Sequence, residues 1–253
     1  GYNHQPLSPK SLDYKGVYSY HTWEESAMVS AMKELVRFNE ELFPNVEKSV
    51  YVPPSNVLSA EGRKVLVEEI PEIKTIASSY FPGDFAYDQE FEWASDGMVE
   101  QPRIISGGML DDFMQLAAFS ELNMHFVNSH FIHPDDTLDV DRGAELGWAV
   151  LKSNLEHYIS WLKSSAPDLR DLTGSQLSGA IQRYSALVPK QERTATGIEW
   201  TFDHFYDEVY LFVRINEGQV GSHVNGGTLT HLTGNLYLLK ATQAKVTMDW
   251  SEE

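Results

Sequence analysis

The sequence predicts an α/β fold: a partial (β/α) barrel over residues 1–193, followed by a small antiparallel β domain over residues 194–253. Over the first range, short strand-like segments alternate with helical segments, an order typical of parallel β/α units. Too few strands are present there to close a barrel, so the order suits the later part of one. Over the second range, strand-like segments follow one another with turn residues between them, a pattern typical of antiparallel sheets.

Capping residues and apolar spacing predict the helices of the first range. The capping residues are, in chain order, Thr22 with Glu25, then Ser59, then Asp111 with Asp112, and Thr173 with Gln176. The helices that they begin are expected to end near Leu42, Ile70, Leu122 and Tyr184. A further long helix, roughly 144–162, is expected to turn four apolar residues toward the core: Trp148, Leu151, Leu155 and Leu162.

Runs of β-branched and aromatic residues, together with period-two alternation, predict the strands. In the first range they are expected at 48–52, 73–77 and 123–131, and in the second at 209–215, 236–240 and 245–250. Pro53-Pro54 should end the first strand because proline cannot donate to the ladder of a sheet. Glu217-Gly218 and Asn225-Gly226-Gly227 supply turn residues between the later strands.

The composition suits a packed core and excludes several classes of function. Hydrophobic residues make up 42% of the 253 residues and aromatic residues 12%, which suits a globular protein. The formal net charge of −18 repels nucleic-acid phosphates and anionic membranes, so neither is expected as a partner. The chain has no cysteine, which excludes disulfides and thiolate zinc sites. No apolar run reaches the length of about 18 residues that a membrane-spanning helix needs.

His4 is the first candidate for chemistry, in the opening segment Gly1-Tyr2-Asn3-His4-Gln5-Pro6-Leu7-Ser8. A neutral imidazole is a common ligand of divalent metals, and two histidines one helical turn apart can share one ion. Only one histidine is present here, and a partner four residues earlier would precede Gly1. The competing interpretation is a polar tail whose histidine has no ligand role.

His130 is the second candidate because it lies at the end of the predicted strand 123–131. In parallel β/α folds, functional side chains gather at the C-terminal ends of strands. A histidine near acidic residues suits a general acid, since its unperturbed pKa is close to neutrality. The alternative is a structural histidine bonded to Asp135 or Asp136. A metal pair with His133 is less favoured, because a strand turns residues three apart toward opposite faces.

The segment Tyr51-Val52-Pro53-Pro54-Ser55-Asn56 is a candidate wall of a substrate groove, because polar residues follow a strand that prolines end. Its residues Tyr51, Pro53, Pro54 and Asn56 are predicted to bind substrate. Trp93 lies in the aromatic and acidic loop from Tyr80 to about Pro102 and is predicted to stack on a sugar. The alternative for the segment is an ordinary junction between a strand and a loop.

Carboxylates suggest a rival chemistry. The candidates are Asp84, Asp88, Glu90, Glu92 and Asp96 in one loop, and Asp111 with Asp112 in the next. Two carboxylates that face each other across a cleft would suit glycoside hydrolysis. Because the chain holds 37 acidic residues, their proximity in sequence also suits a solvated acidic face. Asp111 and Asp112 lie where the acids of a helix N-terminus belong.

Taken in order, these segments resemble the NodB-like polysaccharide deacetylases of carbohydrate esterase family 4. The closest likeness is to a bacterial branch found near exopolysaccharide systems and distantly similar to the Pel polysaccharide deacetylase. The segment Gly1 to Pro6 resembles the end of a motif with two metal histidines, and Tyr51 to Asn56 occupies the place of the groove-wall motif. Asn128-Ser129-His130-Phe131 resembles the late strand that carries the catalytic histidine. The resemblance covers roughly residues 1–185.

The resemblance implies a metal-dependent hydrolysis of the acetamide group of N-acetylated sugars. A divalent metal, commonly zinc, would be held by one aspartate and two histidines and would polarise the acetamide carbonyl and a bound water. His4 would be the second metal histidine, an aspartate the base, and His130 the acid that protonates the leaving amine. The paired aspartates of the family match nothing in this chain and should precede Gly1. The groove-wall motif also lacks its usual arginine, so we expect the chain alone to be inactive.

The resemblance also implies partners and a location. The substrate would be a polysaccharide or oligosaccharide with N-acetylated sugars, and an upstream fragment of the same protein would complete the site. The location would be outside the cytoplasm, or at the surface, of a bacterial cell. Two alternatives stay open: a glycoside hydrolase-like barrel with paired carboxylates, and a non-catalytic carbohydrate-binding protein.

Overall fold

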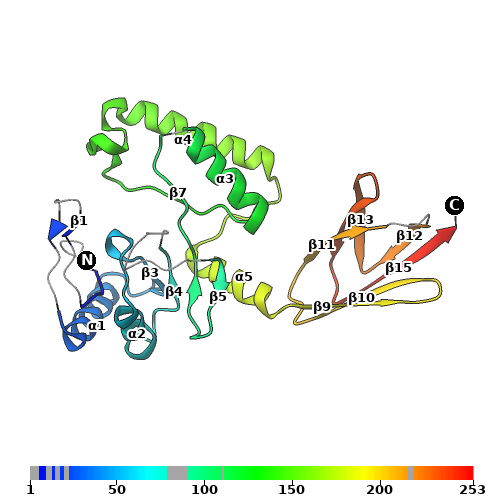
Figure 1. The fold of residues 1–253 in the computed structure, drawn as a ribbon, viewed down its shortest axis with the longest axis horizontal. Coiled ribbons are helices and arrows are strands. Elements are labelled where there is room, and N and C mark those ends of the chain that lie inside the picture. The colour runs from blue at the N-terminus through cyan, green and yellow to red at the C-terminus, as the bar shows by residue number, and fades with distance from the viewer. Residues whose placement is uncertain are drawn as a thin grey trace. The chain divides into compact units, whose positions relative to one another are not determined.

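The computed structural model describes residues 6–9, 13–14, 18–19, 23–78, 90–109, 111–215 and 219–252 of the chain. The chain divides into two compact units, Gly1–Ile181 and Gln182–Glu253 (Figure 1). Among the described residues, the first unit contains two buried hydrophobic clusters and the second unit contains one.

The first unit holds most of the helices. They are α1 (Glu25–Leu42), α2 (Ala60–Glu69), α3 (Asp112–His125) and α4 (Gly147–Ser165), while α5 (Gly174–Ala186) spans the boundary between the units. Ser59 and Asp111 cap α2 and α3 as predicted, because each side chain accepts a hydrogen bond from the backbone N–H three residues later. Thr173 and Gln176 exchange the two hydrogen bonds of a capping box before α5.

Two predictions about helices are wrong. The N-cap of α1 is Glu24 and not Thr22, and the side chain of Glu24 makes no capping hydrogen bond; Thr22 itself lies outside the described residues. Trp148 was expected to face the core, but 61% of it is exposed. The part of α4 that packs against α3 is its second half, where Tyr158 is buried and Trp161 is half-buried. Trp148 lies in the first turn of α4, before this contact begins.

The predicted strand 123–131 is also mostly wrong. Helix α3 continues to His125, and Phe126 ends it with a left-handed backbone, at a φ of 56°. Only β8 (His130–Phe131) is a strand. The residues that α3 buries, Met114, Ala118 and Glu121, recur at helical spacing. The helical spacing of these buried residues extends α3 to His125, although the residues after Leu122 also show the short alternation typical of a strand.

The strands of the first unit are short, and some of them form parallel pairs with a helix between the two strands. They are β1 (Asp13–Tyr14), β2 (Tyr18–Ser19), β3 (Val50–Tyr51), β4 (Thr75–Ile76), β5 (Glu92–Trp93), β6 (Val99–Glu100), β7 (Ile105–Ser106) and β8. Strands β3 and β4 pair in parallel around α2, and β7 and β8 pair in parallel around α3. The predicted parallel β/α units are therefore present, and the described strands do not close a barrel.

One segment connects the two parallel pairs. Residues 99–107 contain β6, which pairs in parallel with β4, and then β7, which pairs in parallel with β8. Beyond β6 the hydrogen bonds with the β4 segment continue, as the backbone N–H of Arg103 donates to the carbonyl of Ser78 at 2.5 Å. Hydrogen bonds therefore join β3, β4, β6, β7 and β8 through residues 99–107, and we call these strands the parallel framework. The antiparallel β5 extends the sheet at β6, in the order β3-β4-β6-β5.

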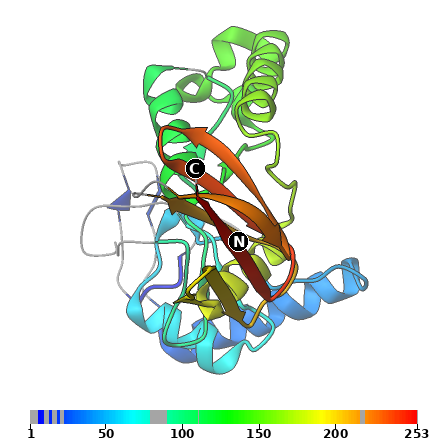
Figure 2. The same cartoon turned by 90° about the vertical axis from the view of Figure 1, so that its right-hand side faces the viewer.

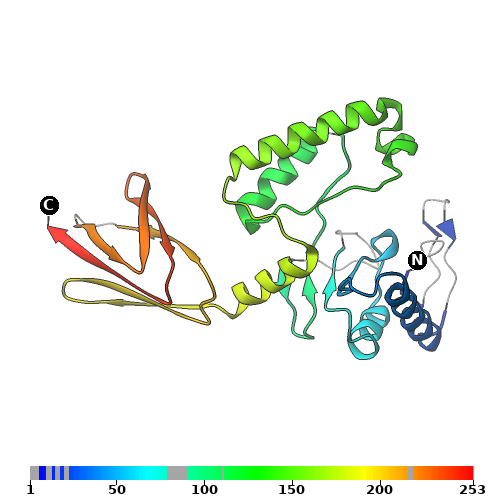
Figure 3. The same ribbon diagram turned by 180° about the vertical axis from the view of Figure 1, so that it is seen from behind.

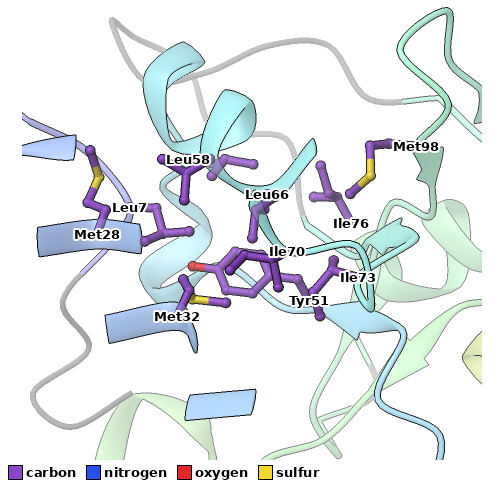
Figure 4. Close-up of a cluster of buried hydrophobic side chains, with 11 residues drawn as sticks. Leu7, Met28, Met32, Tyr51, Leu58, Leu66, Ile70, Ile73, Ile76 and Met98 are labelled. Carbon is purple, nitrogen blue, oxygen red and sulfur yellow. The ribbon is translucent and has the colours of Figure 1, made fainter. Parts of the chain in front are cut away.

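Two hydrophobic clusters stabilise the first unit. The larger one joins α1, α2 and the sheet, and Figure 4 shows the ring of Tyr51 beside Ile70 and Ile73. The smaller one joins α3 and α4, which lie side by side in Figures 1 and 3, through Met114, Tyr158 and their neighbours. Burial of apolar surface contributes about 25 cal/mol per Å², so these clusters fix the helices against the strands.

The second unit consists of two antiparallel sheets, drawn in dark yellow to red in Figure 2. Its strands are β9 (Val188–Arg193), β10 (Gly197–Asp203), β11 (Val209–Arg214), β12 (Gln219–Asn225), β13 (Gly227–Thr233), β14 (Leu236–Ala241) and β15 (Lys245–Glu252). The sheet orders are β12-β15-β10-β9 and β11-β14-β13. Trp200, Met248 and Leu239 are among the buried residues that join both sheets in one core. The three strands predicted here correspond to β11, β14 and β15.

Gly226 makes the turn between β12 and β13, with a φ of +82°. A Cβ there would lie 2.4 Å from the carbonyl oxygen of Lys245, so only glycine fits this position. Across the part of the chain that the structure describes, no helix combines the length and the apolar character needed to cross a membrane.

Candidate functional site

The turn after β3 carries unusual backbone geometry. Ser55 and Asn56, both in the turn η2 (Pro54–Asn56), have positive φ values of 53° and 58°. Residues other than glycine rarely adopt this conformation, although asparagine tolerates it best, and each such residue costs on the order of 1–3 kcal/mol. Two in succession at the C-terminal end of a parallel strand indicate that surrounding contacts hold the turn in place.

Arg103 supplies such a contact. Its Nη2 donates a hydrogen bond to Oδ1 of Asn56 at 2.5 Å. Its guanidinium carbon lies 4.2 Å from the centre of the Phe131 ring, a cation–π geometry. Asn56, Arg103 and Phe131, named here the strand-end cluster, thus come from three segments at the C-terminal ends of the parallel strands. Burial lowers the pKa of Arg103 from its ordinary value, but an arginine remains charged at neutral pH.

His130 lies on the other face of β8 from Phe131, as successive strand residues must. Its Nε2 donates to the carbonyl oxygen of Gly107 at 2.7 Å, and its ring contacts Tyr158 edge-on, with the ring centres 5.1 Å apart. Burial lowers the pKa of His130, while the bond to Gly107 and the charge of Asp136 act in the opposite direction. The ring is therefore neutral at pH 7, with its proton on Nε2 and its lone pair on Nδ1.

The other predicted binding residues lie in different surroundings. Tyr51 is buried in the large hydrophobic cluster, and Pro53 is buried beside it in sequence. Pro54 is half-buried and begins the turn that ends at Asn56. Trp93 is half-exposed on the edge strand β5, where its Nε1 donates to the carbonyl of Gly97 at 3.3 Å. Among the predicted groove residues, Asn56 is thus the one that joins the strand-end cluster.

Two of the candidate carboxylates, Asp96 and Asp111, have structural partners, as does Glu100, which the sequence did not single out. Asp96 and Glu100 both bond to the guanidinium of Arg63, and Asp111 caps α3. Asp84 and Asp88 lie outside the described residues. Glu121 is different: burial raises its pKa to about 7, although Oε1 accepts a bond from the backbone N–H of Ser129 at 3.0 Å. Its Oε2 makes no hydrogen bond within the described part of the chain.

The described residues do not fit the metal that the family resemblance implies. Among them, no group of three or more histidine, aspartate or glutamate side chains could hold an ion. His133 lies 3.6 Å from Asp136, and the Asp136 carboxylate also pairs with Arg142 at 3.3 Å. The guanidinium of Arg142 therefore already balances the charge of this carboxylate. His4, the predicted ligand, lies outside the described residues.

A family model described as an uncharacterised protein conserved in bacteria (DUF2194) matches residues 1–238. The chain belongs to the DUF2194 family. The match extends through the first unit and into β14 of the second, so both units are part of the family. Neither a curated protein nor a solved structure matches the chain.

Sequence reasoning missed two functional candidates in this DUF2194 chain. Arg103 follows Pro102 in an irregular segment, and no local spacing relates it to Asn56, which lies 47 residues earlier. Glu121 falls on the apolar side of a predicted helix, and a lone acid on that side was a signal of burial. Both residues become evident only when the packing of α3 and the strand ends is known.

Proposed function

We propose that this DUF2194 chain is part of a metal-dependent polysaccharide N-deacetylase whose strand-end cluster binds the N-acetylated sugar. The convergence of Asn56, Arg103 and Phe131 at the C-terminal ends of parallel strands carries the proposal. In parallel β/α folds this edge of the sheet is where substrates bind. The groove-wall segment predicted from sequence contributes Asn56 to it. Arg103 offers an arginine at the place where the segment lacks one.

The chemistry of the cluster suits an acetamidosugar. A guanidinium has five N–H donors, so Arg103 can bond to Asn56 and to a ligand oxygen together. The acetamide carbonyl and the sugar hydroxyls are such acceptors, and a bond to a charged donor is worth about 1.5–3 kcal/mol. Phe131 supplies an apolar surface for the C–H face of a sugar ring. The strained turn at Ser55 and Asn56 fixes this arrangement before a ligand binds.

The metal chemistry of the proposal depends on other parts of the protein. His4 is the ligand that the resemblance assigns to this chain, and the resemblance places an aspartate and a further histidine N-terminal to Gly1. We therefore expect the 253-residue chain alone to be inactive. Zinc is the metal that the resemblance favours. His130 is proposed as the general acid that protonates the leaving amine, a role for which its neutral ring must first take up a proton on Nδ1. The proposed location is outside the cytoplasm of a bacterial cell.

The two alternatives receive less support from the described residues. A glycoside hydrolase needs two carboxylates about 5–10 Å apart across a cleft, whereas Asp96 and Glu100 are both held by Arg63. A non-catalytic binding protein would use the same strand-end cluster, so an activity measurement must separate it from a deacetylase.

The test is acetate release from N-acetylated chito-oligosaccharides by a chain extended N-terminal to Gly1. We expect acetate release that a chelator abolishes and that added zinc restores. His130→Ala should lower kcat about a hundredfold, in keeping with the loss of a general acid or base, and His157→Ala, at an exposed position of α4, serves as the matched control. Activity that survives the chelator, or no acetate release at all, would refute the deacetylase proposal.

A further inference from the structure

The outer face of the sheet β11-β14-β13 carries an unusual set of side chains. Residues of β11 alternate: Val209, Leu211 and Val213 pack into the core of the second unit. Tyr210, Phe212 and Arg214 are exposed on the opposite face. The exposed fractions of Tyr210 and Phe212 are 47% and 63%.

The strand register completes this face. Tyr210 lies opposite Lys240 and Phe212 opposite Leu238 in β14, and these two residues in turn lie opposite Thr228 and Thr230 in β13. Side chains directly opposite in an antiparallel pair share a face. We name the resulting set the outer sheet face, consisting of Tyr210, Phe212, Arg214, Thr228, Thr230, Leu236, Leu238 and Lys240.

Polar contacts hold the rim of the outer sheet face in position. The hydroxyl of Tyr210 donates to Glu208 at 2.7 Å, and Lys240 pairs with the same carboxylate at 2.7 Å. Lys240 also lies 5.5 Å from the centre of the Tyr210 ring. Arg214 donates to the side-chain oxygen of Asn235 at 3.0 Å. The Tyr210 ring is therefore held in place before any ligand arrives, which lowers the entropy cost of binding.

From this arrangement we propose that the outer sheet face is a glycan-binding site for β-linked sugar chains. Two aromatic rings on alternate residues of one strand stand about 7 Å apart, so they can contact neighbouring sugar units. A β-linked pyranose presents a flat face of C–H groups, which packs on an aromatic ring, and a rim of hydroxyls. The threonine hydroxyls, the Arg214 guanidinium and the Lys240 ammonium match that rim.

The composition of this face favours a glycan over a protein partner. The exposed apolar groups are aromatic rings, whereas Leu236 and Leu238 are half-buried. A stable protein interface needs about 800 Å² of each partner, with an apolar centre larger than two rings bordered by threonine hydroxyls and cations. The inference does not depend on deacetylase activity, because it concerns binding by the second unit.

The test is isothermal titration calorimetry of the 253-residue chain with cellohexaose and with hexa-N-acetylchitohexaose. We expect at least one of these β-1,4-linked hexasaccharides to bind. The double variant Tyr210→Ala/Phe212→Ala should weaken that binding about tenfold, since it removes both of the ring surfaces on which the sugar units pack. Tyr184→Ala is the matched control, because Tyr184 is 77% exposed on α5 and lies outside the outer sheet face. Its affinity should equal that of the unmodified chain.

The single variant Phe212→Ala provides a second measurement if the double variant unfolds, because Phe212 is exposed and does not belong to the buried cluster described for the second unit. Thermal unfolding of each variant shows whether it is folded. Failure of both glycans to bind, or equal binding by the unmodified and folded variant chains, would overturn the proposal. So would a dimer in sedimentation that the double variant dissociates, because a second copy would then cover the face. The deacetylase proposal is judged separately by acetate release, which this assay does not measure.

Discussion

The Nη2 atom of Arg103 donates a hydrogen bond to Oδ1 of Asn56 at 2.5 Å, and Asn56 has a left-handed backbone with a φ of 58°. The bond joins a strained turn to a half-buried cation that also packs on Phe131. Because the two residues come from different strand ends, this contact forms only when the parallel framework is assembled. Apolar packing alone does not explain this contact, because it is a hydrogen bond between two polar side chains.

Substitutions at Asn56 can separate the hydrogen bond from the backbone strain. Asn56→Ala removes the hydrogen-bond acceptor of a half-buried guanidinium. It also places alanine, which tolerates a left-handed backbone less well than asparagine, at a φ of 58°. We expect the free energy of unfolding to fall by about 2 kcal/mol. Asn56→Gly also removes the acceptor but relieves the strain, so it should be more stable than Asn56→Ala by about 1 kcal/mol. Urea unfolding of the 253-residue chain measures both. Equal stability of the two variants would show that the left-handed backbone is not strained.

The raised pKa of Glu121 predicts that the free energy of unfolding depends on pH. Its pKa in the folded state is about 7, against an ordinary value of 4.5. A raised carboxyl pKa means that the folded state favours the protonated form. The contribution of Glu121 is therefore fully present below about pH 4.5 and is lost as the pH rises through 7, by about 3 kcal/mol in total. The variant Glu121→Gln should be more stable than the unmodified chain above pH 7, and the difference should shrink toward pH 4.5.

The measurement for Glu121 is the free energy of unfolding at several pH values, taken as the difference between each variant and the unmodified chain. Glu72→Gln is the control, since Glu72 is exposed in the turn after α2. Its difference should stay near zero throughout. A difference for Glu121→Gln that does not change with pH would contradict the raised pKa.

Gly62 in α2 should be needed for a close contact and not for flexibility. A Cβ at this position would lie 2.1 Å from the carbonyl oxygen of Leu7 and 2.7 Å from its Cβ. That carbonyl also accepts hydrogen bonds from the backbone and hydroxyl of Ser59. Alanine normally stabilises a helix by about 1 kcal/mol relative to glycine. We expect Gly62→Ala instead to lower the free energy of unfolding by about 2 kcal/mol.

The comparison for Gly62 is Lys64→Ala, an exposed position in the same helix. That variant should stay within about 0.5 kcal/mol of the unmodified chain in urea unfolding. A stabilised Gly62→Ala variant would mean that the N-terminal segment around Leu7 does not pack against α2.

Local signals predicted much of the fold. Ser59, Asp111 and Thr173 each cap a helix through a partner three residues away, so sequence spacing alone identifies them. The strand after α3 was misplaced, because the apolar alternation around Phe126 is short and a continuing helix satisfies it equally well. The β tail was predicted from its alternation and turn residues. Its sheet orders depend on pairings between distant strands that no local pattern encodes.

The candidate site was less predictable for the same reason. Asn56 was identified because it follows a strand that prolines end, and His130 because it ends a later strand. The strand period implied that His130 and Phe131 face opposite sides, but it could not tell which side meets Arg103. The contact between Arg103 and Asn56 is a tertiary one, and a lone arginine in an irregular segment carries no spacing that reveals it.

The central claim, that the strand-end cluster binds the sugar of a deacetylase, is tested most directly by Arg103→Met in a chain extended N-terminal to Gly1. The measurement is kcat/KM for acetate release from N-acetylated chito-oligosaccharides, with Arg37→Met as the control, because Arg37 is exposed on α1. Loss of a charged donor to the substrate should lower kcat/KM by about tenfold or more, while the control keeps its activity and both proteins stay folded in thermal unfolding. Equal kcat/KM for a folded Arg103→Met variant and the unmodified protein would contradict the account.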